Sequence, residues 1–200
     1  MSQAMTTDTR EAILLAAFRC FRTQSLRKTT MVDIARAAEV SRSTVYEYFR
    51  DKDAVVQACA ELASQLFYRN MAKAVDRTGG SSLEDRLTAM AVFVTQARRM
   101  IEPEIYFDDE TVNVMMTKNA AHLLKECADF LAPYFAAARV TGEVRQDLDL
   151  RSATEWFARM LFSLFTTPSP HFEIADEPAV AAFARAYAVR GFVDDLGRRR

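Results

Sequence analysis

The chain has 200 residues, half of them hydrophobic, with five glycines, five prolines and a net charge of −1. This length allows one or two domains with a buried core. No apolar run reaches the roughly 20 residues that a membrane-spanning helix needs, and the amino terminus lacks the features of a signal peptide. We therefore expect a cytoplasmic protein that is not bound to a membrane.

Charge is divided unevenly along the chain. Residues 1–53 contain 9 Lys or Arg and 7 Asp or Glu, whereas the remainder contains 17 and 20, so the net charges are +2 and −3. This is the sign expected for a DNA-binding amino-terminal part joined to an acidic body. The difference is small and supports DNA binding only together with other signals.

Hydrophobic residues recur at helical spacing along most of the chain, and the scarcity of glycine and proline favours long helices with short loops. We predict an all-α fold of about nine helices. The first helix is expected to follow a polar arm of residues 1–7, with Asp8 and Glu11 as its capping box. Its apolar residues are expected to face inward as far as Phe21.

The rest of the chain after residue 50 is expected to form a helical body. A Ser residue followed three positions later by Glu marks two of its helix starts, and Pro133 is expected to kink or split the helix that contains it. The expected helices run from Asp51 to about Val75, from a Ser81–Glu84 capping box, from Glu102–Pro103, from Thr117 to Arg139, from a Ser152–Glu155 capping box to Phe165, and from Pro178 to about Phe192.

Two short helices lie close together after the first helix. One is expected to open at Thr30, with Asp33 three residues later, and the other at Ser41. Only about two residues, Glu39 and Val40, separate them. Helices of two turns joined by so tight a turn must cross steeply, which is the helix-turn-helix arrangement.

The polar residues of the second short helix have the chemistry of a DNA-reading surface. Hydroxyl groups at a helix start reach base edges or phosphates, and Arg binds guanine through two hydrogen bonds in the major groove. Tyr hydroxyls and a Lys just beyond the helix suit phosphate anchoring. The alternative is an ordinary helical hairpin with a solvated polar face. The residues that remain exposed in this assignment are Arg42, Ser43, Thr44, Tyr46, Tyr48 and Lys52.

An ordered set of residues in this segment matches the pattern of a known family. The set comprises Thr29–Thr30, Ile34–Ala35, Ala38, Val40–Ser41, Thr44–Val45–Tyr46, Tyr48–Phe49 and Lys52, with Ala16–Ala17 and Phe21 upstream. It resembles the amino-terminal signature of the TetR (tetracycline repressor) family and covers about a quarter of the chain. A softer similarity to a turn of that family lies at residues 142–149.

The resemblance implies a helix-turn-helix DNA-binding domain at residues 1–50 and a ligand-binding and dimerisation domain at residues 51–200. It implies a homodimer that binds palindromic, double-stranded operator DNA as a transcriptional repressor and is released by a small-molecule effector. Arg42 and Ser43 are then expected to read bases, and most of the others to hold the DNA backbone. The DNA-contact residues carried over by position are Thr30, Arg42, Ser43, Thr44, Tyr46, Tyr48 and Lys52.

Two positions depart from glycines that are usual in the family. Glu39 lies in the turn between the two short helices, and Gln24–Ser25 lie at the end of the first helix. A left-handed backbone at Glu39 would cost on the order of 1 kcal/mol. Glu39 and Glu47 also place negative charge near the DNA. These departures bear on the docking geometry rather than on the family.

Aromatic and methionine residues are frequent in the body, where such side chains form either plain core or the wall of a ligand cavity. The resemblance implies a cavity, and we expect a small, lipophilic effector. The candidate ligand-binding residues are Phe67, Met71, Met90, Phe93, Tyr106, Met115, Phe130, Trp156 and Met160. The last two helices carry more apolar residues than one subunit needs to bury. The candidate dimer-interface residues are Phe157, Leu161, Leu164, Phe183 and Tyr187.

No motif indicates an enzyme, and we expect no cofactor. A nucleophile elbow, a phosphate loop and a dinucleotide fingerprint are all missing from the sequence. His122 and His171 are the only histidines, so we expect no metal site. The three isolated cysteines are expected to be buried thiols rather than redox sensors. The alternative function is a helical small-molecule carrier without DNA binding, which would leave the exposed residues between Arg42 and Lys52 unexplained.

Overall fold

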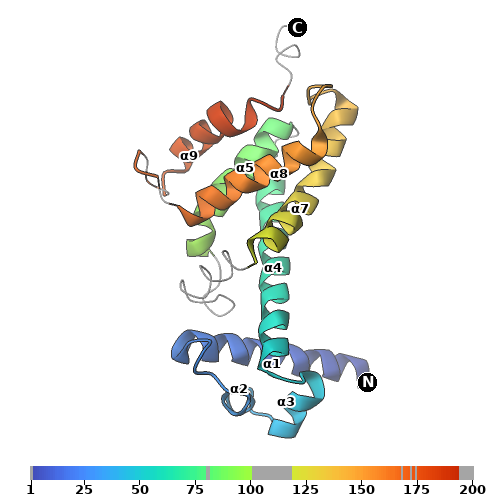
Figure 1. Ribbon diagram of the computed structural model, residues 1–200, viewed down its shortest axis with the longest axis vertical. Helices are drawn as coiled ribbons and strands as arrows, with labels where there is room; N and C mark the ends of the chain where they lie inside the picture. The colour runs from blue at the N-terminus through green and yellow to red at the C-terminus, as the bar shows by residue number, and fades with distance from the viewer. Residues whose placement is uncertain are drawn as a thin grey trace. The chain divides into compact units, whose positions relative to one another are not determined.

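The computed structural model describes residues 2–79, 82–100, 119–167, 169–171, 173 and 175–193, without the side chains of residues 2–8 and 98–100. These residues form eight α-helices and a π-helix (Figure 1). They contain no strand, only an isolated antiparallel bridge between Val144 and Val193. The predicted all-α fold is confirmed. No helix in the described ranges has the length and apolarity needed to cross a membrane.

The chain divides into two compact units, and the division falls inside one helix. The first unit is Met1–Phe67 together with Ile101–Met115, and the second is Tyr68–Met100 together with Met116–Arg200. Helix α4, Lys52–Arg77, therefore contributes residues to both units. The predicted domain division after residue 50 stays a prediction.

The first unit contains α1 (Ser2–Gln24), α2 (Met31–Ala37), α3 (Arg42–Tyr48) and the first part of α4. Helix α1 packs against α2, and α2 packs against α3. The prediction that α1 follows a polar arm is wrong, because the helix already begins at Ser2. A start at Asp8 was expected because the local pattern offers a capping box there, but the helix continues through that position.

The core of the first unit is built from the apolar stripe predicted for α1. Its buried residues are Ile13, Leu14, Ala16, Ala17, Phe18 and Phe21 from α1, with Ile34, Val45, Phe49, Val55 and Cys59 from the following elements. Each of these side chains is removed from water, and burial of a large apolar side chain contributes about 1.5–3 kcal/mol. The stripe therefore fixes the two short helices on one side of α1.

The second unit contains the rest of α4 and five further elements. These are α5 (Leu83–Met100), α7 (Ala120–Thr141), α8 (Leu150–Thr166), α9 (Glu177–Phe183) and the π-helix η2 (Ala184–Val189). Helix α8 packs against α7 and α5, while α9 and η2 pack against α5 (Figure 1). The largest buried side chains here include Leu87, Met90, Leu131, Phe135 and Phe157.

Several predicted helix starts are displaced. Helix α5 is capped by Ser82, whose hydroxyl accepts a hydrogen bond from the Asp85 amide at 3.1 Å, rather than by Ser81. Helix α8 is capped by Asp149, which accepts from the Ser152 amide at 2.9 Å, rather than by Ser152. Both segments offer two acceptor residues a few positions apart, and the sequence pattern does not choose between them.

Two further expectations concern Pro133 and the end of the last helix. Helix α7 runs from Ala120 to Thr141 with the exposed Pro133 inside it, so the predicted split is wrong, whereas the predicted kink stays a prediction. The last helical segment ends at Val189 instead of near Phe192. The helix predicted at Glu102–Pro103 lies outside the described residues.

The turn of residues 142–149 joins three parts of the second unit. Gly142 ends α7 in the left-handed conformation, with φ 76°, and only glycine adopts that conformation without a steric cost. The Glu143 carboxylate accepts a hydrogen bond from the Leu83 amide at 2.6 Å, at the first turn of α5. The Arg145 guanidinium donates to the Gly191 carbonyl at 3.3 Å. We call residues 142–149 the junction turn.

Candidate nucleic-acid interface

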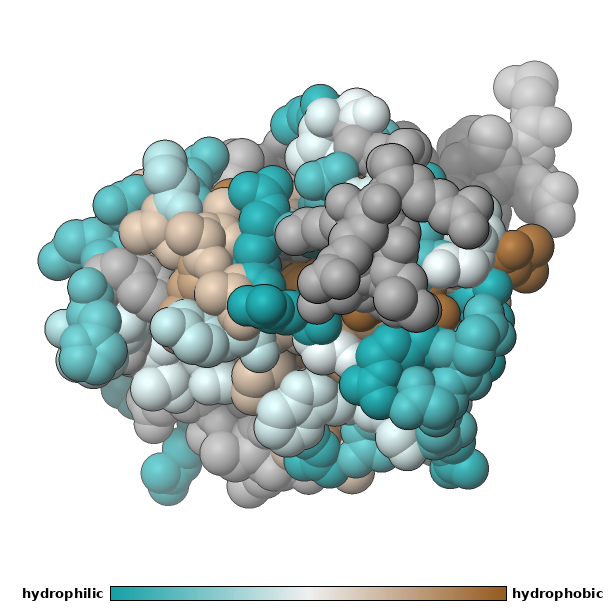
Figure 2. Space-filling model, turned by 90° about the horizontal axis from the view of Figure 1, so that it is seen from above, coloured by the Kyte–Doolittle hydropathy of each residue, from teal (hydrophilic) through white to brown (hydrophobic). Residues whose placement is uncertain are grey.

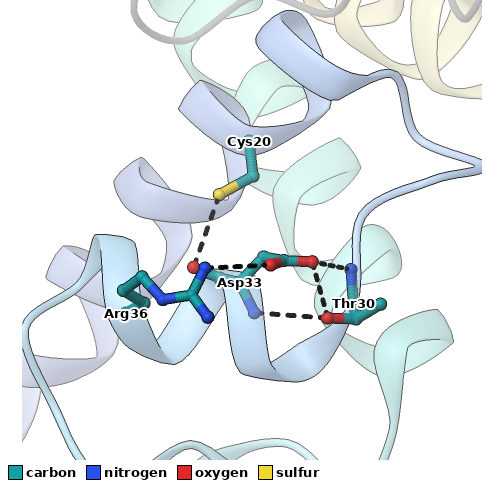
Figure 3. A network of polar contacts seen from close by, with 4 residues as sticks. All are labelled: Cys20, Thr30, Asp33 and Arg36. Atoms are coloured by element: carbon teal, nitrogen blue, oxygen red, sulfur yellow. Dashed lines mark hydrogen bonds and ion pairs between the residues drawn. The ribbon is translucent and has the colours of Figure 1, made fainter.

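The start of α2 is fixed by a reciprocal capping box (Figure 3). The Asp33 amide donates to the Thr30 hydroxyl at 3.3 Å, and the Thr30 amide donates to the Asp33 carboxylate at 3.0 Å. The Thr30 hydroxyl also donates to that carboxylate at 2.6 Å. These hydrogen bonds lower the pKa of Asp33, and Arg36 contributes a further charge contact at 3.5 Å. The predicted helix start at Thr30 is confirmed, and its side chain remains exposed.

The turn between α2 and α3 contains a non-glycine residue in the left-handed region. Glu39 has φ 56°, as predicted for the position where the family usually has glycine. Ser25, at the end of α1, is the second position without the expected glycine, and it also adopts the left-handed conformation, with φ 67°. Each such residue costs on the order of 1–2 kcal/mol relative to glycine sterics. The helix-turn-helix therefore forms with two strained junctions.

Replacing Glu39 with glycine is expected to stabilise the first unit by about 0.5–1 kcal/mol, because relief of the left-handed strain exceeds the extra entropy of an unfolded glycine. The measurement is the free energy of unfolding in denaturant. Ala37→Gly is the matched control, and it should destabilise because Ala37 is helical. Equal effects of the two substitutions would contradict the assignment of strain to Glu39.

The start of α3 is organised by Ser41. Its hydroxyl accepts a hydrogen bond from the Thr44 amide at 3.0 Å, and it lies 2.6 Å from the Ser43 hydroxyl and 2.9 Å from the Thr44 hydroxyl. The predicted helix start at Ser41 is confirmed. Because Ser41 and Ser43 are exposed and Thr44 is half-buried, the cluster presents hydroxyl groups to solvent at the beginning of the helix.

Arg42 and Tyr46 form the exposed centre of α3. The Arg42 guanidinium carbon lies 5.3 Å from the centroid of the Tyr46 ring, in cation–π contact. Tyr46 is 41% exposed, and Arg42 is exposed. Val45, on an adjacent side of the helix, is fully buried. The helix therefore turns its polar residues outward and its apolar residue into the core.

Tyr48 and Lys52 differ from this exposed group. Both are half-buried, and the Lys52 ammonium donates to three carbonyl oxygens, those of Leu26, Arg27 and Thr29. These partners lie 23 to 26 residues away in sequence, so no local pattern could reveal them. Direct phosphate contact by Lys52 stays a prediction.

Comparison with known proteins identifies this helix-turn-helix. The family described as bacterial regulatory proteins, tetR family, matches residues 13–59, from α1 into α4. A curated relative in Haemophilus influenzae, an uncharacterized HTH-type transcriptional regulator, is 32% identical over 78 residues. That match covers 39% of this chain and only 41% of the relative. The similarity to the tetR family therefore covers the helix-turn-helix part of the chain, residues 13–59.

Solved structures of the same fold cover most of the chain. The SmeT–triclosan complex superimposes with a TM-score of 0.62 and 20% identity, covering 94% of this chain and 93% of that one. AibR in complex with isovaleryl coenzyme A and operator DNA superimposes with a TM-score of 0.56 and 18% identity, covering 89% and 96%. At these identities the similarity shows a TetR-type fold for the body as well as the head.

The TetR-type head also carries contacts that sequence reasoning missed. Arg10 lies over the Phe49 ring at 5.4 Å, and Arg19 donates to the Ala37 carbonyl at 2.9 Å. These two residues of α1 hold the ends of α2 and α3. Arg27 and Lys28 are exposed in the segment between α1 and α2. Their adjacency was the only available signal, and two neighbouring cations are too common to single out.

The predicted effector residues do not share one environment. Met71 and Met90 are fully buried and Phe93 nearly so, while Phe67 and Met160 are half-buried. Phe130 stacks on Tyr68, with ring centroids 5.0 Å apart, and burial raises the pKa of Tyr68. Trp156 is 54% exposed. Tyr106 and Met115 lie outside the described residues. Ligand binding by these side chains stays a prediction.

Two of the predicted dimer-interface residues belong to the interior of their own subunit. Phe157 is fully buried, with its ring edge-on to Phe192 at 6.1 Å, and Leu161 is buried as well. Side chains enclosed in this way contribute to the core packing of their own subunit, and their part in a dimer interface stays a prediction. The amphipathic pattern of α8 does not distinguish a face covered by α5 and α7 from one covered by a second copy.

The other predicted interface residues reach the surface. Phe183 is 38% exposed and Tyr187 is 77% exposed, with their rings 5.3 Å apart, and Leu164 is half-buried. On the face drawn in Figure 2, apolar areas (brown and tan) alternate with hydrophilic ones (teal). The exposed aromatic residues are therefore the remaining candidates for subunit contact.

The three cysteines are buried thiols, as predicted. Cys20, Cys59 and Cys127 are free and buried, and burial raises the pKa of all three thiols, to about 12 for Cys59 and Cys127. A raised pKa disfavours the reactive thiolate. Among the described residues no cluster of His, Cys, Asp and Glu could hold a metal ion. His122 lies 3.6 Å from Glu126 on an exposed face of α7.

Proposed function

We propose that the chain is a ligand-responsive transcriptional repressor that binds palindromic operator DNA as a homodimer. The observation that carries the proposal is the outward-facing group of Arg42, Ser43 and Tyr46 on a capped helix of a TetR-type head. Because the matched family consists of regulatory proteins, a regulatory role is favoured over an enzymatic one. The regulator would act in the cytoplasm, where bacterial DNA lies.

The side chains of α3 suit the two kinds of contact that DNA recognition needs. Arg42 has the planar donor pair that binds guanine in the major groove, and Ser43 lies beside it at the helix start. Tyr46 holds the guanidinium over its ring, which reduces the ordering cost of binding. Thr30 and Tyr48 flank this group and would anchor phosphates.

Dimerisation would use the exposed aromatic residues of the second unit. Trp156, Phe183 and Tyr187 are the largest exposed apolar side chains of α8, α9 and η2. Aromatic residues are enriched at protein interfaces, and a symmetric dimer pairs such a patch with its own copy. Two heads held in this way would meet successive major grooves, roughly 34–36 Å apart.

Replacing Phe183 with glutamate is expected to yield monomers that bind DNA poorly, because a buried charge without a partner opposes subunit contact. Sedimentation or light scattering gives the oligomeric state. Glu177→Ala, on the exposed first turn of the same helix, is the matched control and should leave the dimer intact. A Phe183→Glu protein that remains dimeric would refute the interface.

Release by an effector is supported by similar proteins. The SmeT complex contains triclosan, and the AibR complex contains isovaleryl coenzyme A together with operator DNA. We infer a small, lipophilic effector for this chain as well, since Met and aromatic residues are frequent in the body. A coupling free energy of about 1–3 kcal/mol between the two sites would change operator affinity 5- to 150-fold.

The test is selection of duplexes from a randomised DNA pool by the full chain, followed by binding measurements at increasing salt. A repressor of this type should select a sequence with two-fold symmetry and lose affinity steeply, because each phosphate contact releases counterions. A carrier without DNA binding, the alternative function, would select nothing and show no salt dependence.

A further inference from the structure

The Lys52 ammonium forms its hydrogen bonds within the protein. It donates to the carbonyl oxygens of Leu26, Arg27 and Thr29 at 3.2, 3.4 and 3.1 Å. A lysine ammonium has three donors, so these contacts account for all of them. A phosphate could bind this group only by displacing one of the carbonyls.

The segment that Lys52 holds is a closed loop. Ser25 begins it with φ 67°, and its carbonyl accepts hydrogen bonds from both the amide and the hydroxyl of Thr29, at 3.2 and 2.9 Å. Thr29 is buried. Residues 25–29, which we call the basic loop, are thus tied together by Thr29 and tied to α4 by Lys52.

The basic loop presents two cations to solvent. Arg27 and Lys28 are both exposed, and neither forms an ion pair with any residue in the described part of the chain. The nearby carboxylates have other partners. The Asp33 carboxylate accepts a hydrogen bond from the Thr30 hydroxyl and pairs with Arg36. The Asp51 carboxylate pairs with Arg50 at 3.1 Å and accepts a hydrogen bond from the Ala54 amide at the start of α4. Among the residues that the structure describes, none neutralises the charge of the loop.

The basic loop lies next to the helix-turn-helix formed by α2 and α3. It leads directly into Thr30, where α2 begins, and Lys52 follows four residues after the end of α3 at Tyr48. The Lys52 ammonium therefore connects the segment that precedes α2 to the segment that follows α3. When α3 lies in a major groove, cations beside the helix-turn-helix suit the phosphates that border the groove.

We propose that Lys52 is a positioning residue that fixes the basic loop, and that Arg27 and Lys28 on this loop contact backbone phosphates of the bound DNA. This inference rests on the proposed DNA-binding function and adds two contact residues to it. It also gives Lys52 a different role from the direct phosphate contact expected from the sequence.

The experiment is a mutant cycle with the full chain and the duplex selected by the wild-type protein. The variants are Arg27→Ala/Lys28→Ala, Lys52→Met and the combination of all three. Arg69→Ala/Lys73→Ala, which removes the same charge from an exposed part of α4, is the matched control. Affinity is measured over a range of salt concentrations, and amide hydrogen exchange reports the order of residues 25–29.

The loop variant should lower the slope of log affinity against log salt by ~0.9 for each phosphate contact removed, while the charge control leaves it unchanged. Lys52→Met should weaken DNA binding and accelerate exchange in the loop. The combined variant should bind no more weakly than the loop variant, because Lys52 acts through the loop. Arg27→Lys/Lys28→Arg should restore wild-type binding.

Three results would overturn the proposal. An unchanged salt slope in the loop variant, with Arg42→Ala still impaired, would remove the loop contacts and leave the proposed function standing. Additive losses from Lys52→Met and the loop variant would show that Lys52 contacts DNA itself. A wild-type chain that selects no duplex would overturn the proposed function and this inference together.

Discussion

Replacing Arg42 with alanine is expected to weaken operator binding by about 5- to 150-fold for each head, the equivalent of roughly 1–3 kcal/mol for one guanine contact. The loss should be accompanied by relaxed preference at one base pair in each half-site. Arg42 is exposed on α3 and contacts only the Tyr46 ring among the interactions found around it. Folding and dimerisation should therefore be unaffected. Quantitative binding to the selected duplex and to single-base variants measures both effects.

Substitutions of Tyr46 separate the predicted loss of affinity from the predicted loss of base preference. Tyr46→Phe keeps the ring under the Arg42 guanidinium and removes only the hydroxyl, whereas Tyr46→Ala removes both. Tyr46→Ala should therefore reduce base preference as well as affinity, and Tyr46→Phe should reduce affinity alone. Arg159→Ala, an exposed arginine of α8 paired with Glu155, is the control. Wild-type affinity and preference in Arg42→Ala would refute the assignment of α3 as the reading element.

Replacing Phe157 with alanine is expected to destabilise the subunit by about 3–5 kcal/mol, because a large buried ring is removed and a cavity remains. Phe157 and Phe135 both meet Phe192 edge-on, at 6.1 and 5.2 Å. The loss of one ring therefore weakens the attachment of the last described residues to α7 and α8. Denaturant unfolding monitored by circular dichroism measures the change.

Tyr187→Ala is the matched control for Phe157→Ala. Tyr187 is 77% exposed, so its removal should leave the packing of the subunit unchanged and affect only association. The stability loss of Phe157→Ala should be independent of protein concentration. A loss that disappears at high concentration would instead place Phe157 in an interface between subunits.

The head was the part most accessible to prediction, because its decisive features are local. The Thr30–Asp33 box, the Ser41 cap and the left-handed Glu39 each depend on residues within three or four positions, and each is present in the structure. The inward stripe of α1 follows from helical periodicity alone. These relations can be predicted from the chain because backbone geometry fixes the partners.

The roles that escaped prediction depend on contacts between distant residues. The Lys52 ammonium donates to carbonyl groups in the segment before α2. The Phe157 ring contacts Phe192, which lies much later in the chain. An apolar residue on α8 has the same pattern whether its neighbour is α5 or a second copy of the chain. Periodicity gives the face of a helix, and only the fold gives what covers that face.

The junction turn has a consequence for the order of folding. The first turn of α5 depends on Glu143, which is 60 residues away, and the Gly191 carbonyl depends on Arg145, 46 residues away. Closing such long stretches of chain costs entropy before the contacts can form. Helices α7 and α8, whose connection is short, should therefore pair early. The start of α5 and the segment around Phe192 should attach later, in a single cooperative step.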